Sequence, residues 1–306
     1  MSRADASNAP PAALAFDVRC ALGESIVWCS HERALWWTDI ESRRIWRHRT
    51  GDASGQWWST PGRVGSLALC ESGRLLLGME DGLFLADPER HAAGAALPCE
   101  RICRVPVEAA MRINDGRADR SGNFVFGTLN EDPARARTGR FYQYSARHGL
   151  RRLELDAVAI ANGICFEADG AGMYYCDSLQ RRIMRVRYAA ATASVSSPRV
   201  FADVEEPGEP DGAVVDAAGN VWSAQWGAAR LACHSPSGKV ERVLPLPVSQ
   251  PTCPTFAGDG LDVMFIATAR TGLDESQLLA QPSAGGVFAA RVEGARGLVE
   301  PRFADA

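Results

Sequence analysis

A turn made of a small residue, a glycine and a polar residue, followed by a short apolar run, recurs along this chain and constrains its fold more than any other feature. The turn glycines are Gly73, Gly122, Gly170 and Gly219, so successive copies lie 49, 48 and 49 residues apart. A period of this size indicates an array of similar supersecondary units, and short strands with regular turns are typical of propeller blades. Six such units need roughly 290 residues, which fits a chain of 306.

A second, longer repeat supports the first. Residues 36–47 (WWTDIESRRIWR) resemble residues 174–185 (YYCDSLQRRIMR), at an offset of 138 residues that is close to three periods. Each copy predicts a strand, a tight turn and a returning strand, with Asp39 and Asp177 as structural hydrogen-bonding residues at the strand ends. A β-sandwich with chance similarity between hairpins is the alternative, but the even glycine spacing favours an all-β, six-bladed β-propeller.

The composition agrees with one large domain. Hydrophobic residues make up 46% of the chain, which is ample for a packed core, and no linker divides the sequence. We therefore predict a single propeller domain over residues 14–306. Residues 1–13 contain little apolar surface to bury and are expected to form a loose N-terminal arm. Long helical patterns are nearly absent, and residues 272–279 are the best candidate for a short helix.

Charge and motif content exclude several classes of function. A net charge of −4 argues against a nucleic-acid partner, and the absence of an 18-residue apolar run argues against a membrane span. An odd number of cysteines, nine, without an export signal predicts a reduced, cytoplasmic protein. The five scattered histidines favour neither a histidine-based zinc site nor a Ser-His-Asp triad. The oligomeric state stays open.

Polar residues that share one phase of the repeat point to a metal site. Asn114, Asn162 and Asp211 each precede a turn glycine by eight residues, which places them at equivalent points of successive blades. If these points begin the inner strands, the side chains enter the central channel, and Glu24 joins them from the first blade. Two carboxylates and two amides suit a hard divalent cation. Each motif alone is also an ordinary turn dipeptide, but their common phase favours a metal in the channel.

The segments around these residues resemble the SMP-30/gluconolactonase/regucalcin-like family over about residues 16–290. The matching segments are Gly23-Glu24-Ser25 with Trp28, residues 112–116 (RINDG), 127–129 (GTL), 162–164 (NGI), 174–178 (YYCDS), 210–212 (PDG) and 265–270 (FIATAR). They occur in the family's order and spacing. The resemblance implies a six-bladed propeller and the activity of a sugar lactonase, which is a carboxylic ester hydrolase.

The resemblance also implies roles for individual residues. Glu24, Asn162 and Asp211 match the ligands of one divalent cation, which could be Ca²⁺, Zn²⁺, Mg²⁺, Mn²⁺ or Fe²⁺. Asp211 also matches the residue thought to act as general base. Arg112 and Asn114 match residues that hold the substrate, and Asn114 sometimes reaches the ion. A structural ion pair with a neighbouring carboxylate is the alternative for Arg112.

One substrate contact stays ambiguous at this level. Some members of the family bind sugar through an acidic residue that follows a Gly-Thr-Met segment. Here residues 127–129 read Gly-Thr-Leu, and both Glu131 and Asp132 follow closely. Either of the two is a candidate for that substrate-binding role.

The expected function is metal-dependent hydrolysis of an aldonolactone to the aldonic acid. Candidate substrates are L-arabinono-1,4-lactone, D-xylonolactone, D-galactonolactone and D-gluconolactone, with a metal-activated water and Asp211 as general base. Two alternatives are open: phosphotriester hydrolysis on the same scaffold, and a non-catalytic calcium-binding or regulatory propeller. The polar set of Arg112, Asn114 and Glu131 or Asp132 favours a sugar over an apolar phosphotriester.

Overall fold

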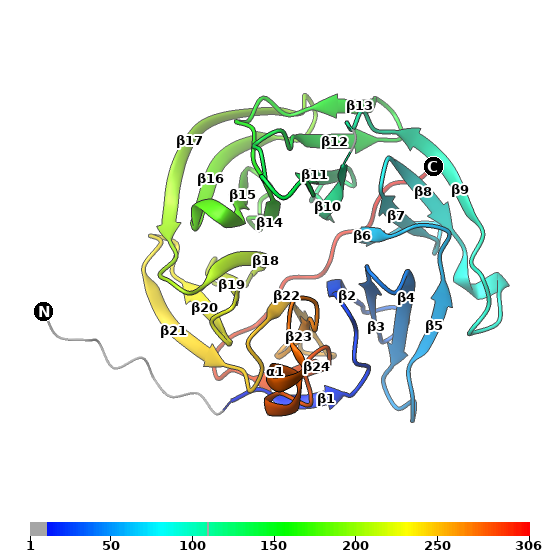
Figure 1. Cartoon of the computed structure of the whole chain (residues 1–306). Helices are drawn as coiled ribbons and strands as arrows, with labels where there is room; N and C mark the ends of the chain where they lie inside the picture. The colour runs from blue at the N-terminus through cyan, green and yellow to red at the C-terminus, as the bar shows by residue number, and fades with distance from the viewer. Residues whose placement is uncertain (1–10, 109) are drawn as a thin grey trace, which may run out of the picture.

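Six four-stranded antiparallel sheets surround a central channel in the computed structural model, which describes residues 11–108 and 110–306 (Figure 1). The predicted all-β, six-bladed propeller is confirmed. Residues 1–10 of the predicted arm lie outside the described residues. The described sheet begins one residue before the predicted domain boundary, because Ala13 opens the first strand and the Ala12 N–H donates to the Pro245 carbonyl at 3.0 Å.

The first three blades use consecutive strands, each running from the channel outward. Blade one comprises β2 (Gly23–Cys29), β3 (Ala34–Asp39), β4 (Arg44–Arg49) and β5 (Gln56–Ser59). Blade two comprises β6 (Val64–Leu69), β7 (Leu75–Met79), β8 (Gly82–Ala86) and β9 (Cys99–Arg104), with a 3₁₀ turn at Pro88–Arg90. Blade three comprises β10 (Met111–Ala118), β11 (Phe124–Asn130), β12 (Phe141–Ser145) and β13 (Gly149–Arg152).

The next two blades repeat this order, and the sixth is completed by the N-terminal strand. Blade four comprises β14 (Ala161–Phe166), β15 (Gly172–Asp177), β16 (Arg182–Ala189) and β17 (Ser194–Asp203), with a 3₁₀ turn at Ser178–Gln180. Blade five comprises β18 (Glu209–Val215), β19 (Val221–Trp226), β20 (Arg230–His234) and β21 (Val240–Pro245). Blade six comprises β22 (Pro251–Ala257), β23 (Val263–Thr268), β24 (Val287–Arg291) and β1 (Ala13–Phe16).

The ring is closed by hydrogen bonds between the two ends of the propeller. Strand β1 pairs antiparallel with β24, so blade six has the order β22-β23-β24-β1. The sequence repeat did not indicate this pairing, because the two strands are separated by nearly the whole chain and share no local pattern. Apolar side chains fill the space between neighbouring blades. Trp36 of blade one, for example, stacks on Trp58 and packs in a cluster with Val64 and Leu77 of blade two.

The repeated glycines occupy the turns that join the first and second strands of blades two to five. Gly73, Gly122, Gly170 and Gly219 have φ values of 87, 80, 72 and 83°. This left-handed region costs glycine no steric clash, because glycine has no Cβ. The 49-residue period is therefore the spacing of one obligatory turn per blade.

Asp39 and Asp177 fix the starts of two inner strands. The Asp39 carboxylate accepts hydrogen bonds from the backbone N–H groups of Ala21 and Leu22, at 3.1 and 3.0 Å. In blade four, Asp177 accepts from the two residues 159 and 160, at 3.0 and 3.2 Å. The prediction that both aspartates are structural hydrogen-bonding residues is confirmed. Each carboxylate anchors the chain two residues before a candidate metal ligand.

The C-terminal strap, residues 292–306, runs behind the ring from blade six toward blade two (Figure 1). The Arg296 carbonyl accepts a backbone hydrogen bond from blade five, at 2.7 Å. The Phe303 N–H donates to blade two at 2.8 Å, and the Ala304 N–H donates to blade three at 2.9 Å. The Phe303 side chain is fully buried. The strap thus links blades that are not neighbours in the chain.

The helix predicted at 272–279 is present as α1 (Glu275–Ala280), which begins after a capping box at Asp274.

All nine cysteines carry free thiols, and seven of them are buried. Among the described residues, no helix is long and apolar enough to cross a membrane.

Candidate functional site in the central channel

One cavity of about 360 Å³ lies at the channel and collects most of the residues selected from the sequence. Its lining includes Glu24, Arg112, Asn114, Glu131, Asn162 and Asp211. Asp132 is not part of this lining. Its carboxylate accepts a hydrogen bond from the N–H of Ala134 at 2.8 Å, in an exposed turn. Of the two acidic candidates after the Gly-Thr-Leu segment, Glu131 is therefore the one that faces the cavity.

A register irregularity in each inner strand turns the polar side chains toward the channel. The irregularities lie between Glu24 and Val27, Val64 and Ser66, Ile113 and Gly116, Asn162 and Cys165, Pro210 and Ala213, and Pro251 and Pro254. Such bulges interrupt the strict alternation of side chains and re-aim the residues beside them. Glu24, Asn114, Asn162 and Asp211 all lie at or within one of these bulges, so the four blades present them at the same level.

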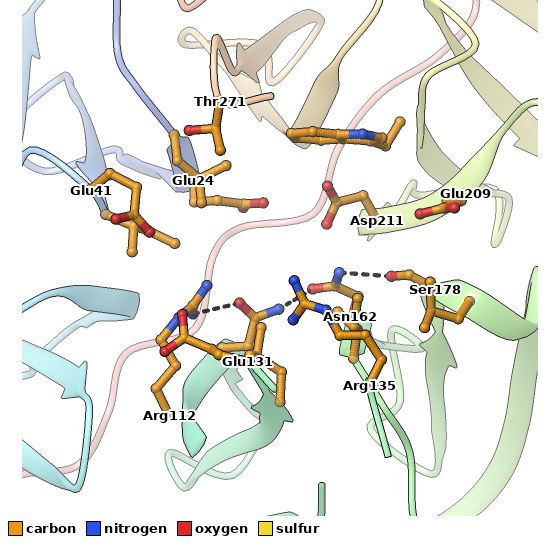
Figure 2. A pocket seen from close by; sticks show the side chains of 17 residues that line it. Glu24, Glu41, Arg112, Glu131, Arg135, Asn162, Ser178, Glu209, Asp211 and Thr271 are labelled. Atoms are coloured by element: carbon orange, nitrogen blue, oxygen red, sulfur yellow. Dashed lines mark hydrogen bonds and ion pairs between the residues drawn. The ribbon is translucent and has the colours of Figure 1, made fainter. Parts of the chain in front are cut away.

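Glu24 and Asp211 point toward each other across the cavity (Figure 2). The Glu24 carboxylate accepts a hydrogen bond from the Ser25 N–H at 3.0 Å. Burial, followed by the charge of Asp115, raises the pKa of Glu24. Burial, followed by the charges of Glu24 and Asp115, raises the pKa of Asp211 well above its ordinary range. Within the described residues, neither Glu24 nor Asp211 forms a salt bridge with a basic side chain.

The donor set fits a divalent cation. Two buried carboxylates that face each other without a basic partner are destabilised unless a positive charge lies between them. Glu24, Asp211 and the amide oxygen of Asn162 are all oxygen donors, which hard divalent cations prefer. In the part of the chain that the structure describes, no three His, Cys, Asp or Glu side chains form a metal-binding group by themselves. A cation between Glu24 and Asp211 would have the Asn162 amide oxygen as a further donor in the same cavity.

A chain of hydrogen bonds fixes the two amides of the cavity. Arg112 Nη1 donates to Asn114 Oδ1 at 2.8 Å, and Asn114 Nδ2 donates to Asn162 Oδ1 at 2.7 Å. Asn162 Nδ2 then donates to Ser178 Oγ at 2.9 Å (Figure 2), and Ser178 Oγ donates to the Pro210 carbonyl at 2.8 Å. Because every donor in the chain has a partner, the orientation of both amide groups is determined. The Asn162 oxygen retains a second lone pair for a ligand.

Arg112 is buried and joins a second polar group at the cavity wall. Its Nε lies 3.2 Å from Glu131 Oε1, and Arg63 donates from both Nη groups to Glu131, each at 2.8 Å. We call this group the Arg63–Glu131–Arg112 bridge. The ion pair that was the alternative for Arg112 therefore exists, yet Arg112 also lines the cavity. The hydrogen bond that Glu131 accepts from Arg63 is the main cause that lowers the pKa of Glu131.

Several cavity residues were not among the site candidates chosen from the sequence. They are Glu41, Arg135, Ser178, Glu209, Trp226 and Thr271, together with the apolar Leu22, Ile40, Leu129, Ile160 and Leu179. Trp226 ends β19 and pairs with Glu209 at the start of β18, two residues before Asp211. The pairing of β19 with β18 brings Trp226 to the cavity. A sequence motif around Asp211 does not reveal a residue that reaches the cavity from the neighbouring strand. The cavity thus combines a polar centre with an aromatic and aliphatic wall.

A family model and several known proteins match most of the chain. A family model described as "SMP-30/Gluconolactonase/LRE-like region" matches residues 22–270. The chain is 40% identical over 297 residues to an L-arabinolactonase of Azospirillum brasilense, covering 96% of this chain and 95% of that protein. It is 32% identical over 286 residues to a 6-deoxy-6-sulfogluconolactonase of Pseudomonas putida, covering 92% and 95%.

A solved structure agrees with these matches. The crystal structure of a calcium-binding protein, regucalcin, from Agrobacterium tumefaciens superposes with a TM-score of 0.84 at 27% identity, covering 96% of this chain and 98% of that one.

Proposed function

Because this chain belongs to the SMP-30/gluconolactonase/LRE-like family, we propose that it is a sugar lactonase, which hydrolyses an aldonolactone to the aldonic acid. L-arabinono-1,4-lactone is the first substrate to test, since the L-arabinolactonase relative matches nearly the full length of both chains. D-xylonolactone and D-gluconolactone are the next candidates. The reaction requires one divalent cation, and calcium is among the candidates because one structural relative is a calcium-binding protein.

The observation that carries this proposal is the meeting of an uncompensated carboxylate pair and a substrate-binding group in one cavity. Glu24 and Asp211 supply the charge that attracts a cation, and Asn162 supplies a fixed amide oxygen. Arg112 and Glu131 stand in the same cavity as a donor and an acceptor for hydroxyl groups. This polarity favours a sugar over an apolar phosphotriester.

The reaction adds water to the lactone carbonyl carbon and breaks the bond from that carbon to the ring oxygen. Glu24, Asn162 and Asp211 would hold a divalent cation, which would supply Lewis-acid polarisation of the reacting oxygens when bound. Asp211 acts as general base, because its buried carboxylate lines the cavity that the substrate and the attacking water enter. It accepts a proton from the attacking water and returns it to the ring oxygen that leaves. The products are the carboxylate, a hydroxyl group and one released proton.

Arg112 and Asn114 orient the substrate, and Arg112 stabilises the developing negative charge. The Asn114 amide already donates to the Ala161 carbonyl and to Asn162 Oδ1, so its carbonyl oxygen accepts from a substrate hydroxyl. Among the described residues, the Arg112 Nη2 group has no hydrogen-bond partner, so it can donate to the substrate carbonyl oxygen. Glu131 accepts a hydrogen bond from a sugar hydroxyl at the other side of Arg112. Trp226 offers a flat apolar surface to the C–H face of the sugar ring.

The test is metal-dependent lactone opening. The protein is stripped with a chelator and given Mg²⁺, Ca²⁺, Mn²⁺, Zn²⁺ or Fe²⁺ in turn, and proton release is followed on 1,4- and 1,5-aldonolactones with spontaneous hydrolysis subtracted. We expect turnover only with metal and highest on L-arabinono-1,4-lactone. Asp211→Asn should lose turnover even at a cation concentration that saturates its weakened site, while Asp169→Asn, in an exposed turn, serves as the control.

Two outcomes would redirect the proposal. No turnover above background with any cation would exclude the lactonase, and phosphotriesters would be the next substrates. Calcium binding that persists without activity on either class would instead support a regulatory, non-catalytic propeller.

A further inference from the structure

Arg63 lies outside the cavity lining but contacts carboxylates from three blades. It precedes β6 in blade two, and its two Nη groups donate to different oxygens of Glu131 in blade three, both at 2.8 Å. The Arg63 N–H donates to Glu80 of blade two at 2.9 Å, and Nη1 lies 3.5 Å from Glu41 of blade one. A two-pronged guanidinium–carboxylate contact of this kind fixes geometry as well as charge.

Glu131 needs an external partner to hold its orientation. It follows the last residue of β11, at the start of the exposed loop that leads to β12. A glutamate in such a position has several rotamers of similar energy. Arg63 holds both carboxylate oxygens, and Arg112 adds a contact to Oε1 at 3.2 Å. Oε1 accepts from both arginines, whereas Oε2 accepts from Arg63 alone and keeps a free lone pair. Because Glu131 lines the cavity, the held carboxylate presents this one acceptor to whatever enters.

The surrounding charges make this role specific to an arginine. Arg63 and Arg112 face Glu131 directly, while Glu41 and Glu80 contact Arg63. The cluster thus carries two positive and three negative side chains, and Glu131 is one member of a shared network. Lysine would preserve the charge of Arg63 but would not form the parallel pair of hydrogen bonds.

We propose that Arg63 is a positioning residue for substrate recognition, which holds the Glu131 carboxylate toward the cavity so that it accepts a hydrogen bond from a substrate hydroxyl. This inference rests on the proposed lactonase function for its kinetic consequence. Glu131 contacts Arg112 and is not among the groups that hold the cation or move the proton. Arg63 should therefore affect substrate binding more than the chemical step, which separates its role from general structural support.

Three variants test the kinetic consequence. In Arg63→Gln we expect KM to rise about tenfold with kcat within about threefold of the unaltered protein, because one hydroxyl contact is lost. Arg63→Lys should recover part of the loss. Arg101→Gln is the matched control, since Arg101 forms a comparable ion pair with Asp81 in the same blade at 3.0 Å and does not line the cavity. Its KM should not change.

The pH dependence of KM gives a second readout. The hydrogen bond from Arg63 lowers the pKa of Glu131, so the acceptor stays ionised on mild acidification. In Arg63→Gln the pKa of Glu131 should return toward its ordinary value, with Arg112 still lowering it in part. KM of this variant should therefore rise more steeply than that of the unaltered protein as pH falls toward 4. A pH profile parallel to that of the unaltered protein would contradict the proposal.

A measurement that does not need turnover separates this inference from the proposed function. The ¹³C carboxyl signal of Glu131, assigned by its loss in Glu131→Gln, can be titrated by NMR in full-length protein. We expect a pKa below the ordinary glutamate value, and a rise in both Arg63 variants. Unchanged titration in Arg63→Gln or Arg63→Lys would overturn the inference even if the protein hydrolyses lactones. Conversely, the shift would support the holding role even if no lactone were a substrate.

Discussion

Asn114 donates a hydrogen bond from Nδ2 to Oδ1 of Asn162 across the boundary between blades three and four, at 2.7 Å. The bond selects one of the two orientations of each amide. It leaves the Asn162 oxygen beside Asn114 and its NH₂ group beside Ser178. Two neighbouring blades must therefore keep their relative position for this orientation of the Asn162 amide to be kept, which the proposed cation site requires.

Ser178→Ala should weaken cation binding without unfolding the protein. The Ser178 hydroxyl accepts from Asn162 and donates to the Pro210 carbonyl, so its loss frees the amide and the backbone before Asp211. Partners of metal ligands typically contribute about 10- to 100-fold in affinity. Calorimetric titration of the chelator-treated protein measures this. Ser223→Ala, which removes another buried hydroxyl that donates to a backbone carbonyl within blade five, should leave cation affinity unchanged.

Glu24→Gln should stabilise the metal-free protein at pH 8. Burial and neighbouring carboxylates raise the pKa of Glu24 in the folded state, so the folded protein binds more protons than the unfolded chain between about pH 4 and the raised pKa. The stability that the protonated Glu24 side chain contributes is therefore fully present in acid, and it is lost as the pH rises from about 4 through the raised pKa. Removing the charge should recover about 1–3 kcal/mol at pH 8.

Thermal unfolding with a chelator at pH 5 and pH 8 measures this effect. The increase in Tm of Glu24→Gln over the unaltered protein should be larger at pH 8 than at pH 5. Glu71→Gln, which changes an exposed glutamate, should show no such increase at either pH. A saturating divalent cation should reverse the order of stability, because only the unaltered site retains both charged ligands. A variant less stable than the unaltered protein at pH 8 under chelation would refute the charge argument.

Trp226→Ala should raise KM for the lactone several-fold with little change in metal affinity. Trp226 is the aromatic residue of the cavity lining, and an aromatic contact contributes about 0.5–1.5 kcal/mol beyond simple burial. Trp226→Phe should retain most of the binding. Steady-state kinetics compares both variants with Trp57→Phe, which alters an outer strand of blade one. Equal KM values for all three would argue against a sugar-stacking surface.

Phe303→Ala should lower the stability of the propeller substantially. The ring is fully buried among side chains of blades two and three, including Phe124 and Tyr144. Truncation of such a phenylalanine typically costs about 3–5 kcal/mol. Urea unfolding measures the loss, and Leu279→Ala is the control because that side chain is 83% exposed. A loss below about 1 kcal/mol would show that the strap contributes little to the fold.

Features that depend on local chemistry were predictable from the sequence. Gly122 and its counterparts must adopt positive φ, so their spacing revealed the blade period. Asp39 and Asp177 were identified because each follows an aromatic pair and precedes a turn. The phase of Asn162 and Asp211 relative to those glycines placed them in one channel, and the cavity does bring them together.

Features that depend on the ring as a whole were not predictable. The partner of β1 is β24, and no periodic pattern connects strands at opposite ends of the chain. The choice between Glu131 and Asp132 was decided by the turn after β11, where Asp132 caps its own loop and Glu131 meets Arg63 of another blade. Trp226 enters the cavity through strand pairing. Each of these outcomes requires knowledge of which blade lies beside which.

The pairing of β1 with β24 has a consequence for how the chain acquires its structure during synthesis. Strand β1 is translated long before its partner, so its backbone edge stays unpaired until β24 has been made. Blade six cannot be completed until β24 has emerged, and the strap can add its contacts only after that. Contacts of such large sequence separation slow folding and prolong the exposure of an unpaired edge. Ring closure therefore has to wait until β24 has been synthesised, long after the strand that it pairs with.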